Sequence, residues 1–195
     1  MSLTFRSLTG AQIAPVLDDV ARLRIAVFRD WPYLYDGDLD YERGYLGQLA
    51  GSPDAIVVTA EADGRIVGAA TGAPMEGHAA DFGQAVAAQG MDLRDVFYCA
   101  ESVLLPEYRG QGAGHAFFDA REAQARALGR RHCLFCAVVR PDDHPARDPA
   151  YRPLDAFWKA RGYRKIEGMV ATFAWRDIGA SSETMKPLQF WGKAL

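Results

Sequence analysis

The stretch Val103-Leu104-Leu105-Pro106-Glu107-Tyr108-Arg109-Gly110-Gln111-Gly112-Ala113-Gly114 joins an apolar strand to a helix through a turn with three alternating glycines. Glycine permits positive φ angles and lets ligand atoms approach the backbone closely. The first N–H groups of the helix that follows have no partner within it and favour an anion. Arg109 adds a charge-assisted hydrogen-bond donor. We therefore expect this turn to bind a phosphate group as well as to redirect the chain.

Two common phosphate-binding motifs do not fit this turn. The Walker loop requires lysine and then serine or threonine after its last glycine, where this chain has His115. The dinucleotide fingerprint spaces its glycines G-x-G-x-x-G and places an acidic residue at the end of the next strand. Here the third glycine comes one residue early, and the next strand ends at Val139-Arg140. The glycine spacing thus disfavours a dinucleotide-dependent enzyme.

The patterns on either side of the turn predict alternating helices and strands. Asp63-Gly64 between two apolar runs is typical of a β-hairpin, and Pro106 is expected to end the strand before the turn. The order predicts one mixed α/β domain over residues 1–195 with a single central sheet. The expected helices are 12–29, 41–50, 81–89, 113–129 and 154–161, and the expected strands are 55–60, 65–71, 96–105, 132–139, 163–176 and the tail 185–194.

Composition excludes several classes of protein. The net charge of −3 argues against a general nucleic-acid binder, which needs a basic surface. No run approaches the roughly 20 apolar residues of a membrane helix, and the first residues do not resemble a signal peptide, so we expect a cytoplasmic protein. Three cysteines do not form a disulfide framework. Cys133 and Cys136 lie three apart in a strand and should face opposite sides, so no metal site is predicted.

The stretch 103–114 resembles the coenzyme A site of the GNAT superfamily of N-acetyltransferases, whose core pattern is Arg/Gln-x-x-Gly-x-Gly/Ala. Arg109, Gly112 and Gly114 occupy the defined positions, and the element order agrees over residues 1–176. The resemblance implies a mostly antiparallel, twisted central sheet flanked by helices. It also implies acetyl-CoA as co-substrate, without a metal, and transfer of its acetyl group to an amine by direct attack in a ternary complex.

The resemblance further implies roles for individual residues. The diphosphate of coenzyme A would lie on the N–H groups of the turn, and the pantetheine arm would pair with the preceding strand like an added strand. The acetyl group would enter where the two central strands, 96–105 and 132–139, splay apart. The residues assigned to the cofactor are Val103, Leu104, Leu105, Arg109, Gly110, Gln111, Gly112, Ala113, Gly114 and Trp158.

Acetyl transfer requires a neutral amine and is helped by protonation of the leaving thiolate. Glu101, in an otherwise apolar strand, is the candidate general base; a structural pairing with an arginine is an equal alternative. The tyrosine that often serves as acid in this family is replaced by Trp158, whose indole is not a useful proton donor. Tyr151, Tyr98 or water is left as the donor, or no acid is needed, and Trp158 would pack on the pantetheine.

Residues 28–45 combine aromatic and acidic side chains, and the corresponding region of the family shapes the acceptor pocket. Such a mixture suits a cationic amine. The alternative is that the aromatic residues belong to the core and the aspartates cap the helix near residue 40. A small amine, an amino acid and a peptide amine all stay open as acceptors, and so do monomer and homodimer. The alternative function is a non-catalytic acyl-CoA-binding sensor or interaction module.

Overall fold

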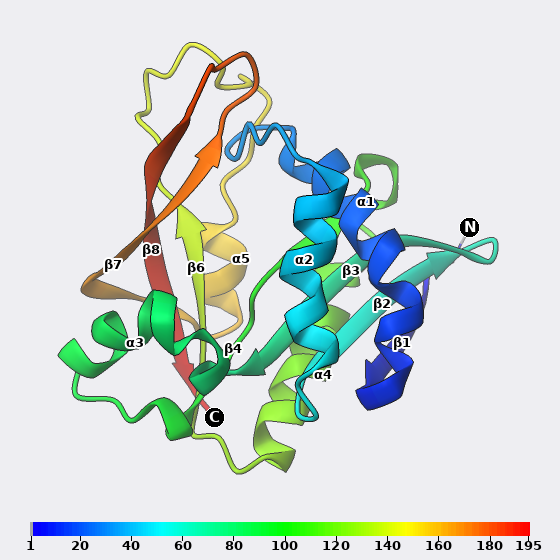
Figure 1. Cartoon of the computed structure of the whole chain (residues 1–195), viewed down its shortest axis with the longest axis vertical. Coiled ribbons are helices and arrows are strands. Elements are labelled where there is room, and N and C mark those ends of the chain that lie inside the picture. The colour runs from blue at the N-terminus through cyan, green and yellow to red at the C-terminus, as the bar shows by residue number, and fades with distance from the viewer. Residues whose placement is uncertain (1) are drawn as a thin grey trace.

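One eight-stranded sheet runs through the computed structural model, which describes residues 2–195 (Figure 1). Its order is β1-β2-β3-β4-β6-β8-β7, with β5 paired to β3, and every pairing is antiparallel except the parallel pair β4–β6. This confirms the mixed α/β class with a mostly antiparallel sheet. Met1, the first residue of the predicted domain, lies outside the described residues. The strands are β1 (Thr4–Thr9), β2 (Ile56–Ala62), β3 (Arg65–Pro74), β4 (Val96–Tyr98), β5 (Ser102–Leu104), β6 (His132–Val138), β7 (Arg164–Arg176) and β8 (Glu183–Ala194).

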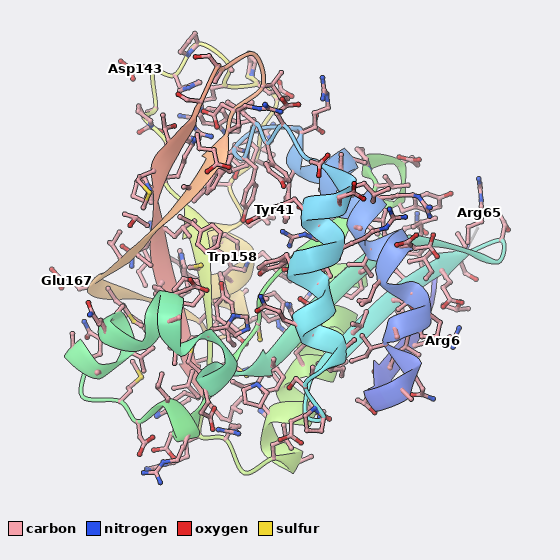
Figure 2. The ribbon with its side chains drawn as sticks, viewed as in Figure 1. Arg6, Tyr41, Arg65, Asp143, Trp158 and Glu167 are labelled. Atoms are coloured by element: carbon pink, nitrogen blue, oxygen red, sulfur yellow. The ribbon has the colours of Figure 1, made fainter. Side chains whose placement is uncertain are left out.

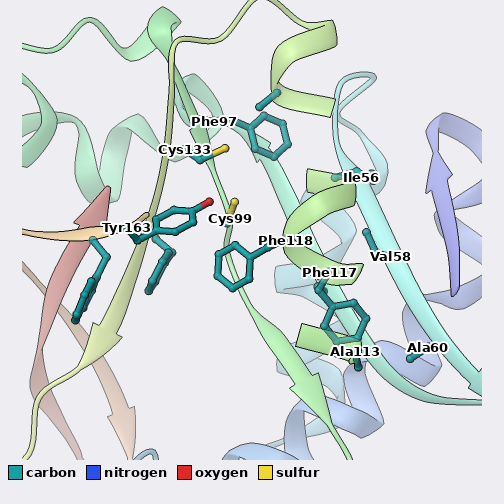
Figure 3. Close-up of a cluster of buried hydrophobic side chains, with 14 residues drawn as sticks. Ile56, Val58, Ala60, Phe97, Cys99, Ala113, Phe117, Phe118, Cys133 and Tyr163 are labelled. Atoms are coloured by element: carbon teal, nitrogen blue, oxygen red, sulfur yellow. The ribbon is translucent and has the colours of Figure 1, made fainter. Parts of the chain in front are cut away.

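Helices cover both faces of this sheet. Figure 1 shows α1 and α2 side by side over β2 and β3, with α4 behind these strands. Residues of β2 alternate between the two layers: Val57 packs in the cluster under α1 and α2, whereas Ile56 and Val58 pack against α4 (Figure 3). None of the helices within residues 2–195 is long and apolar enough to cross a membrane. The α-helices are α1 (Leu17–Phe28), α2 (Leu39–Ala50), α3 (Ala79–Ala88), α4 (Ala113–Ala127) and α5 (Asp155–Ala160), and short 3-10 turns lie at Gly10–Gln12, Ala14–Val16, Met75–His78, Leu93–Asp95 and Pro106–Tyr108.

The N-terminal region differs from the sequence-based expectation. Strand β1 was not predicted, because Leu8 is its only buried residue. The strand pairs with β2 at the edge of the sheet, and an antiparallel strand there needs only one face covered by the core. The helix expected from residue 12 begins at Leu17, after two 3-10 turns, the second of which has Pro15 in its first turn. The hairpin at Asp63-Gly64 is confirmed, with positive φ at both residues (50° and 73°).

The strand expected over residues 96–105 is divided in two by a β-bulge. Thr71 O accepts a hydrogen bond from Ala100 N–H, and Thr71 N–H donates to Glu101 O, each at 3.1 Å, so two residues oppose one. The ladder between β4 and β6 ends at Tyr98 opposite Leu134. Beyond the bulge, β5 pairs with β3 and with no other described strand. The bulge is therefore where the two central strands part.

A buried arginine of α4 holds this bulge. Arg121 is 1% exposed, and its Nη1 donates to the carbonyl oxygens of Glu101 at 2.9 Å and Thr71 at 3.2 Å. Its Nη2 donates to Ser102 Oγ at 2.9 Å and its Nε to Phe117 O at 3.1 Å. Both carbonyl groups also accept from a backbone N–H at the bulge, so the guanidinium binds the second lone pair of each. Arg121 thus fixes the shape of the central strand from the helix side.

We expect Arg121→Leu to lower the free energy of unfolding by about 3 kcal/mol, because it removes a charged donor from several buried acceptors at once. Arg126→Leu on the same helix is the matched control. Arg126 is 52% exposed and lies 3.7 Å from Glu122, so its loss should cost less than about 1 kcal/mol. Urea unfolding of both variants measures the difference. Equal losses would show that Arg121 does not hold the bulge.

Candidate functional site

The three glycines of the turn have two different structural roles. Gly110 and Gly112 have φ of 78° and 84°, and a Cβ added to either would meet no atom within 4 Å. Glycine is needed at both positions for the backbone conformation, and the space beside them is open. A Cβ on Gly114 would instead lie 3.0 Å from Phe157 Cζ, so this glycine allows α4 to pack closely on α5.

The turn presents a row of backbone donors. The N–H groups of His115 and Ala116 both donate to Gly112 O, at 3.0 and 3.2 Å, and close the first turn of α4. Within residues 2–195, the N–H groups of residues 110–114 have no hydrogen-bond acceptor. Arg109 is exposed beside them. This donor set at a helix start has the properties of an anion-binding site.

One edge of β5 is open beside the turn. Leu105 N–H bonds to Val67 O at 3.0 Å, so by alternation Val103 also faces β3. The N–H and C=O groups of Leu104 then point to the other edge, where no described strand pairs. The Leu104 side chain and Trp158 of α5 are half-buried at the margin of one apolar cluster, and the Trp158 ring lies edge-on to Phe135 at 4.9 Å.

A cavity of about 400 Å³ lies between the α1–α2 pair and the β7–β8 pair. Figure 2 shows Tyr41 on the side of α2 that faces these strands. The volume falls in the range of small-molecule sites. Its aromatic lining consists of Phe28, Tyr33, Tyr35, Tyr41, Tyr45, Phe82, Tyr98, Phe173 and Trp175. Its charged lining consists of Arg24, Asp36, Asp38, Glu101, Arg176 and Glu183.

The expected acceptor segment, residues 28–45, forms one wall of this cavity. Trp175 Nε1 donates to Tyr33 O at 3.0 Å, and Asp36 N–H donates to Arg176 O at 2.9 Å, which fastens the segment to β7. Arg140, not singled out from the sequence, donates to Tyr33 O at 2.7 Å and makes a bidentate pair with Asp177.

The aspartates of this segment were expected either to bind the acceptor or to cap the helix near residue 40, and Asp38 is placed for both. Its carboxylate accepts from Tyr41 N–H at 2.9 Å and caps α2, and it also lines the cavity. Trp31 and Asp40, by contrast, are not part of the lining.

Glu101 lies in the cavity wall within a buried charge cluster. Its Oε1 accepts from Thr71 Oγ1 at 2.7 Å, and its Oε2 pairs with Arg24 Nη1 at 2.7 Å. The Arg24 guanidinium also bonds to Glu42, which is fully buried. Burial disfavours the charge of Arg24, but the interactions with Glu101, Tyr45 and Glu42 outweigh it and raise the pKa of Arg24. Glu101 is thus both paired with an arginine and placed on the cavity.

Arg24 was not among the residues predicted for the site. The available signal was its position four residues after Val20 and four before Phe28, on the buried face of α1. An arginine on such a face needs buried carboxylate or carbonyl partners.

The tyrosines considered as proton donors are placed differently. Tyr98, the last residue of the β4–β6 ladder, lines the cavity, and its hydroxyl lies 3.1 Å from Cys136 Sγ. Burial raises the pKa of Tyr98 well above its usual value and that of Cys136 to about 11, so both are protonated at neutral pH. Tyr151 is not in the lining; its ring is edge-on to Trp31 at 6.3 Å.

Cys133 and Cys136 lie in separate clusters on the two faces of β6. Among residues 2–195, no three His, Cys, Asp or Glu side chains are grouped to hold a metal ion.

The sequence model of the acetyltransferase (GNAT) family matches residues 20–163. No curated protein sequence matches the chain.

Solved structures share the fold at low identity. A phosphinothricin acetyltransferase from Sinorhizobium meliloti in complex with AcCoA is 17% identical, with a TM-score of 0.62 over 100% of this chain and 89% of that one. A ribosomal-protein-alanine N-acetyltransferase from Brucella melitensis is 15% identical, with a TM-score of 0.62 over 98% and 99% of the two chains. The PaiA N-acetyltransferase from Thermoplasma acidophilum in complex with coenzyme A is 12% identical, with a TM-score of 0.58 over all of both chains.

We expect Arg24→Met to lower the free energy of unfolding by about 3–5 kcal/mol, because it leaves two buried carboxylates without their cation. The double variant Arg24→Met/Glu42→Gln should regain part of this loss, since one of the charges is removed. Arg22→Met on the same helix, at a side chain 59% exposed, should cost at most about 1 kcal/mol. Urea unfolding measures all three. A double variant no more stable than Arg24→Met would contradict the charge cluster.

Proposed function

Because the chain belongs to the acetyltransferase (GNAT) family, we propose that it transfers the acetyl group of acetyl-CoA to the amine of a small molecule, by direct attack in a ternary complex. The observation that carries this proposal is the bulge at Ala100–Glu101. It leaves one edge of β5 open beside the donor-rich turn and sets Glu101 in the wall of an aromatic cavity. A cofactor site and an acceptor site thus meet at one interruption of the sheet.

The residues of the turn fit the chemistry of coenzyme A. The N–H groups of residues 110–114 and the exposed Arg109 would bind the diphosphate, and the open edge at Leu104 would pair with the amides of the pantetheine arm. Trp158 would cover part of that arm. Bound acetyl-CoA supplies an activated thioester.

Glu101 is assigned the role of proton acceptor. Its carboxylate takes the proton of the acceptor ammonium, so that the neutral amine can attack. Thr71 and Arg24 hold the two carboxylate oxygens and orient them. For the leaving thiolate, Tyr98 is better placed as donor than Tyr151, because Tyr98 lines the cavity where β4 and β6 part.

We expect wild-type protein to bind acetyl-CoA in the micromolar range and Gly112→Asp to weaken that binding by about 100-fold or more, since a carboxylate facing the diphosphate costs several kcal/mol. Gly64→Asp is the matched control. Gly64 also has a positive φ (73°) and open space around it, but it lies in the β2–β3 hairpin. Calorimetric titration compares the three proteins. Failure of the wild type to bind would mean that the turn is only structural.

We expect Glu101→Gln to lower kcat/KM for amine acetylation by about 10²–10⁴-fold, the usual contribution of a general base, while acetyl-CoA binding stays unchanged. Arg24 keeps its pair with Glu42 in this variant, so the fold should persist. Glu61→Gln, which removes a carboxylate that pairs with Arg6 on β1, is the control and should retain full activity. Steady-state kinetics decides the matter: an active Glu101→Gln would leave Glu101 with a structural role alone.

A further inference from the structure

We propose that the acceptor is a primary amine on an aromatic ring with a short linker and no carboxylate of its own, as in the arylalkylamines. This inference rests on the proposed function, since it names the second substrate of the same site. Three features of the cavity carry it: its aromatic surface, its charge and its volume.

The aromatic surface is continuous across two sides of the cavity. Phe28 of α1 stacks on Tyr33 with ring centroids 4.3 Å apart, and Tyr33 lies 5.9 Å from Trp175 of β7. The Arg24 guanidinium lies over the Tyr45 ring, 4.6 Å from its centroid, so an aromatic ring covers this buried cation as well. A flat ring gains stacked and edge-on contacts on such a surface, and an aliphatic chain of equal length does not.

The charges of the lining favour a cation and disfavour an anion. Four carboxylates face two guanidiniums, and both guanidiniums are already paired: Arg24 with Glu101, and Arg176 with Asp36 at 2.7 Å. An ammonium group is attracted to this excess of negative charge. The carboxylate of an amino acid would meet no uncommitted cation among the described lining residues. An aromatic amine should therefore be preferred to the amino acid with the same ring.

The volume fits one such molecule. At about 400 Å³ the cavity lies near the lower end of the roughly 300–1,000 Å³ typical of ligand sites. Among the lining residues, Glu101 is 8% exposed, whereas Tyr41 of α2 is 51% exposed. This gradient places the amine at the closed end and the ring between the aromatic walls.

The test begins with acetyl-CoA binding by the full chain, measured by calorimetry, and continues with release of free coenzyme A in the presence of single amines. The panel pairs phenethylamine with butylamine, and tyramine with tyrosine. We expect kcat/KM for phenethylamine to exceed that for butylamine by about 10-fold or more, as contacts between aromatic groups imply. Tyramine should exceed tyrosine by a larger factor.

Two variants test the position of the ring. Tyr41→Ala should raise KM for phenethylamine several-fold and leave the kinetics with butylamine nearly unchanged. Because Tyr41 is 51% exposed, its removal takes little packing from the core. Phe5→Ala removes a 37%-exposed ring from the edge strand β1 and should change neither.

The outcomes separate the two proposals. Acetyl-CoA binding with butylamine or tyrosine as the better substrate would overturn the acceptor assignment and leave the acetyltransferase proposal in place. Absence of both binding and turnover would overturn the proposed function, and the acceptor assignment with it.

Discussion

The hydrogen bonds from the Arg121 guanidinium to the carbonyl groups of Thr71 and Glu101 hold the bulge on which the open edge of β5 and the position of Glu101 depend. A sheet normally satisfies its carbonyl groups with the next strand. At the bulge these two carbonyl groups keep their backbone partners, the N–H groups of Thr71 and Ala100, and a side chain from α4 adds a further donor to each. The charge of Arg121 is stabilised by the carbonyl dipoles and by the face of the Phe118 ring, whose centroid is 4.8 Å away. The bulge can therefore persist in the interior, and with it the open edge of β5 and the placement of Glu101.

A second arginine connects the helices to the same point. Arg24 belongs to α1, Glu42 to α2 and Glu101 to the bulge, so one guanidinium ties three elements together. Buried ion pairs often contribute little net stability, because desolvation offsets attraction, but breaking one is costly. The effect of these ion pairs here is to fix the position of α1 and α2, which form one wall of the cavity, relative to the central strand.

The glycine turn before α4 could be predicted from the sequence because the features that form it are local. Three alternating glycines and Arg109 lie within a few residues, and the hairpin at Asp63-Gly64 is equally local. The bulge could not be predicted in this way. Residues 96–105 have the pattern of one continuous strand, and what interrupts them is Arg121 and Thr71, both distant in the sequence. Strand β1 was not predicted, because five of its six residues are exposed and its sequence therefore shows no hydrophobic periodicity.

The aromatic cavity depends on residues that are even more widely separated in the sequence. Its lining comes from α1, α2, α3, β4, β6, β7, β8, the segment 29–38, the bulge at Ala100–Glu101 and residues 181–182, and each contributes only one to four side chains. The sequence pointed to residues 28–45, but the opposing wall around Trp175 follows only from the β7–β8 pairing and the contacts of Arg140. Under the proposed function, backbone groups of the turn recognise the cofactor whatever the acceptor, because they do not depend on side-chain identity. The cavity wall is made of side chains from many elements, so substitutions there would alter the proposed acceptor site and leave the bulge and the turn unchanged.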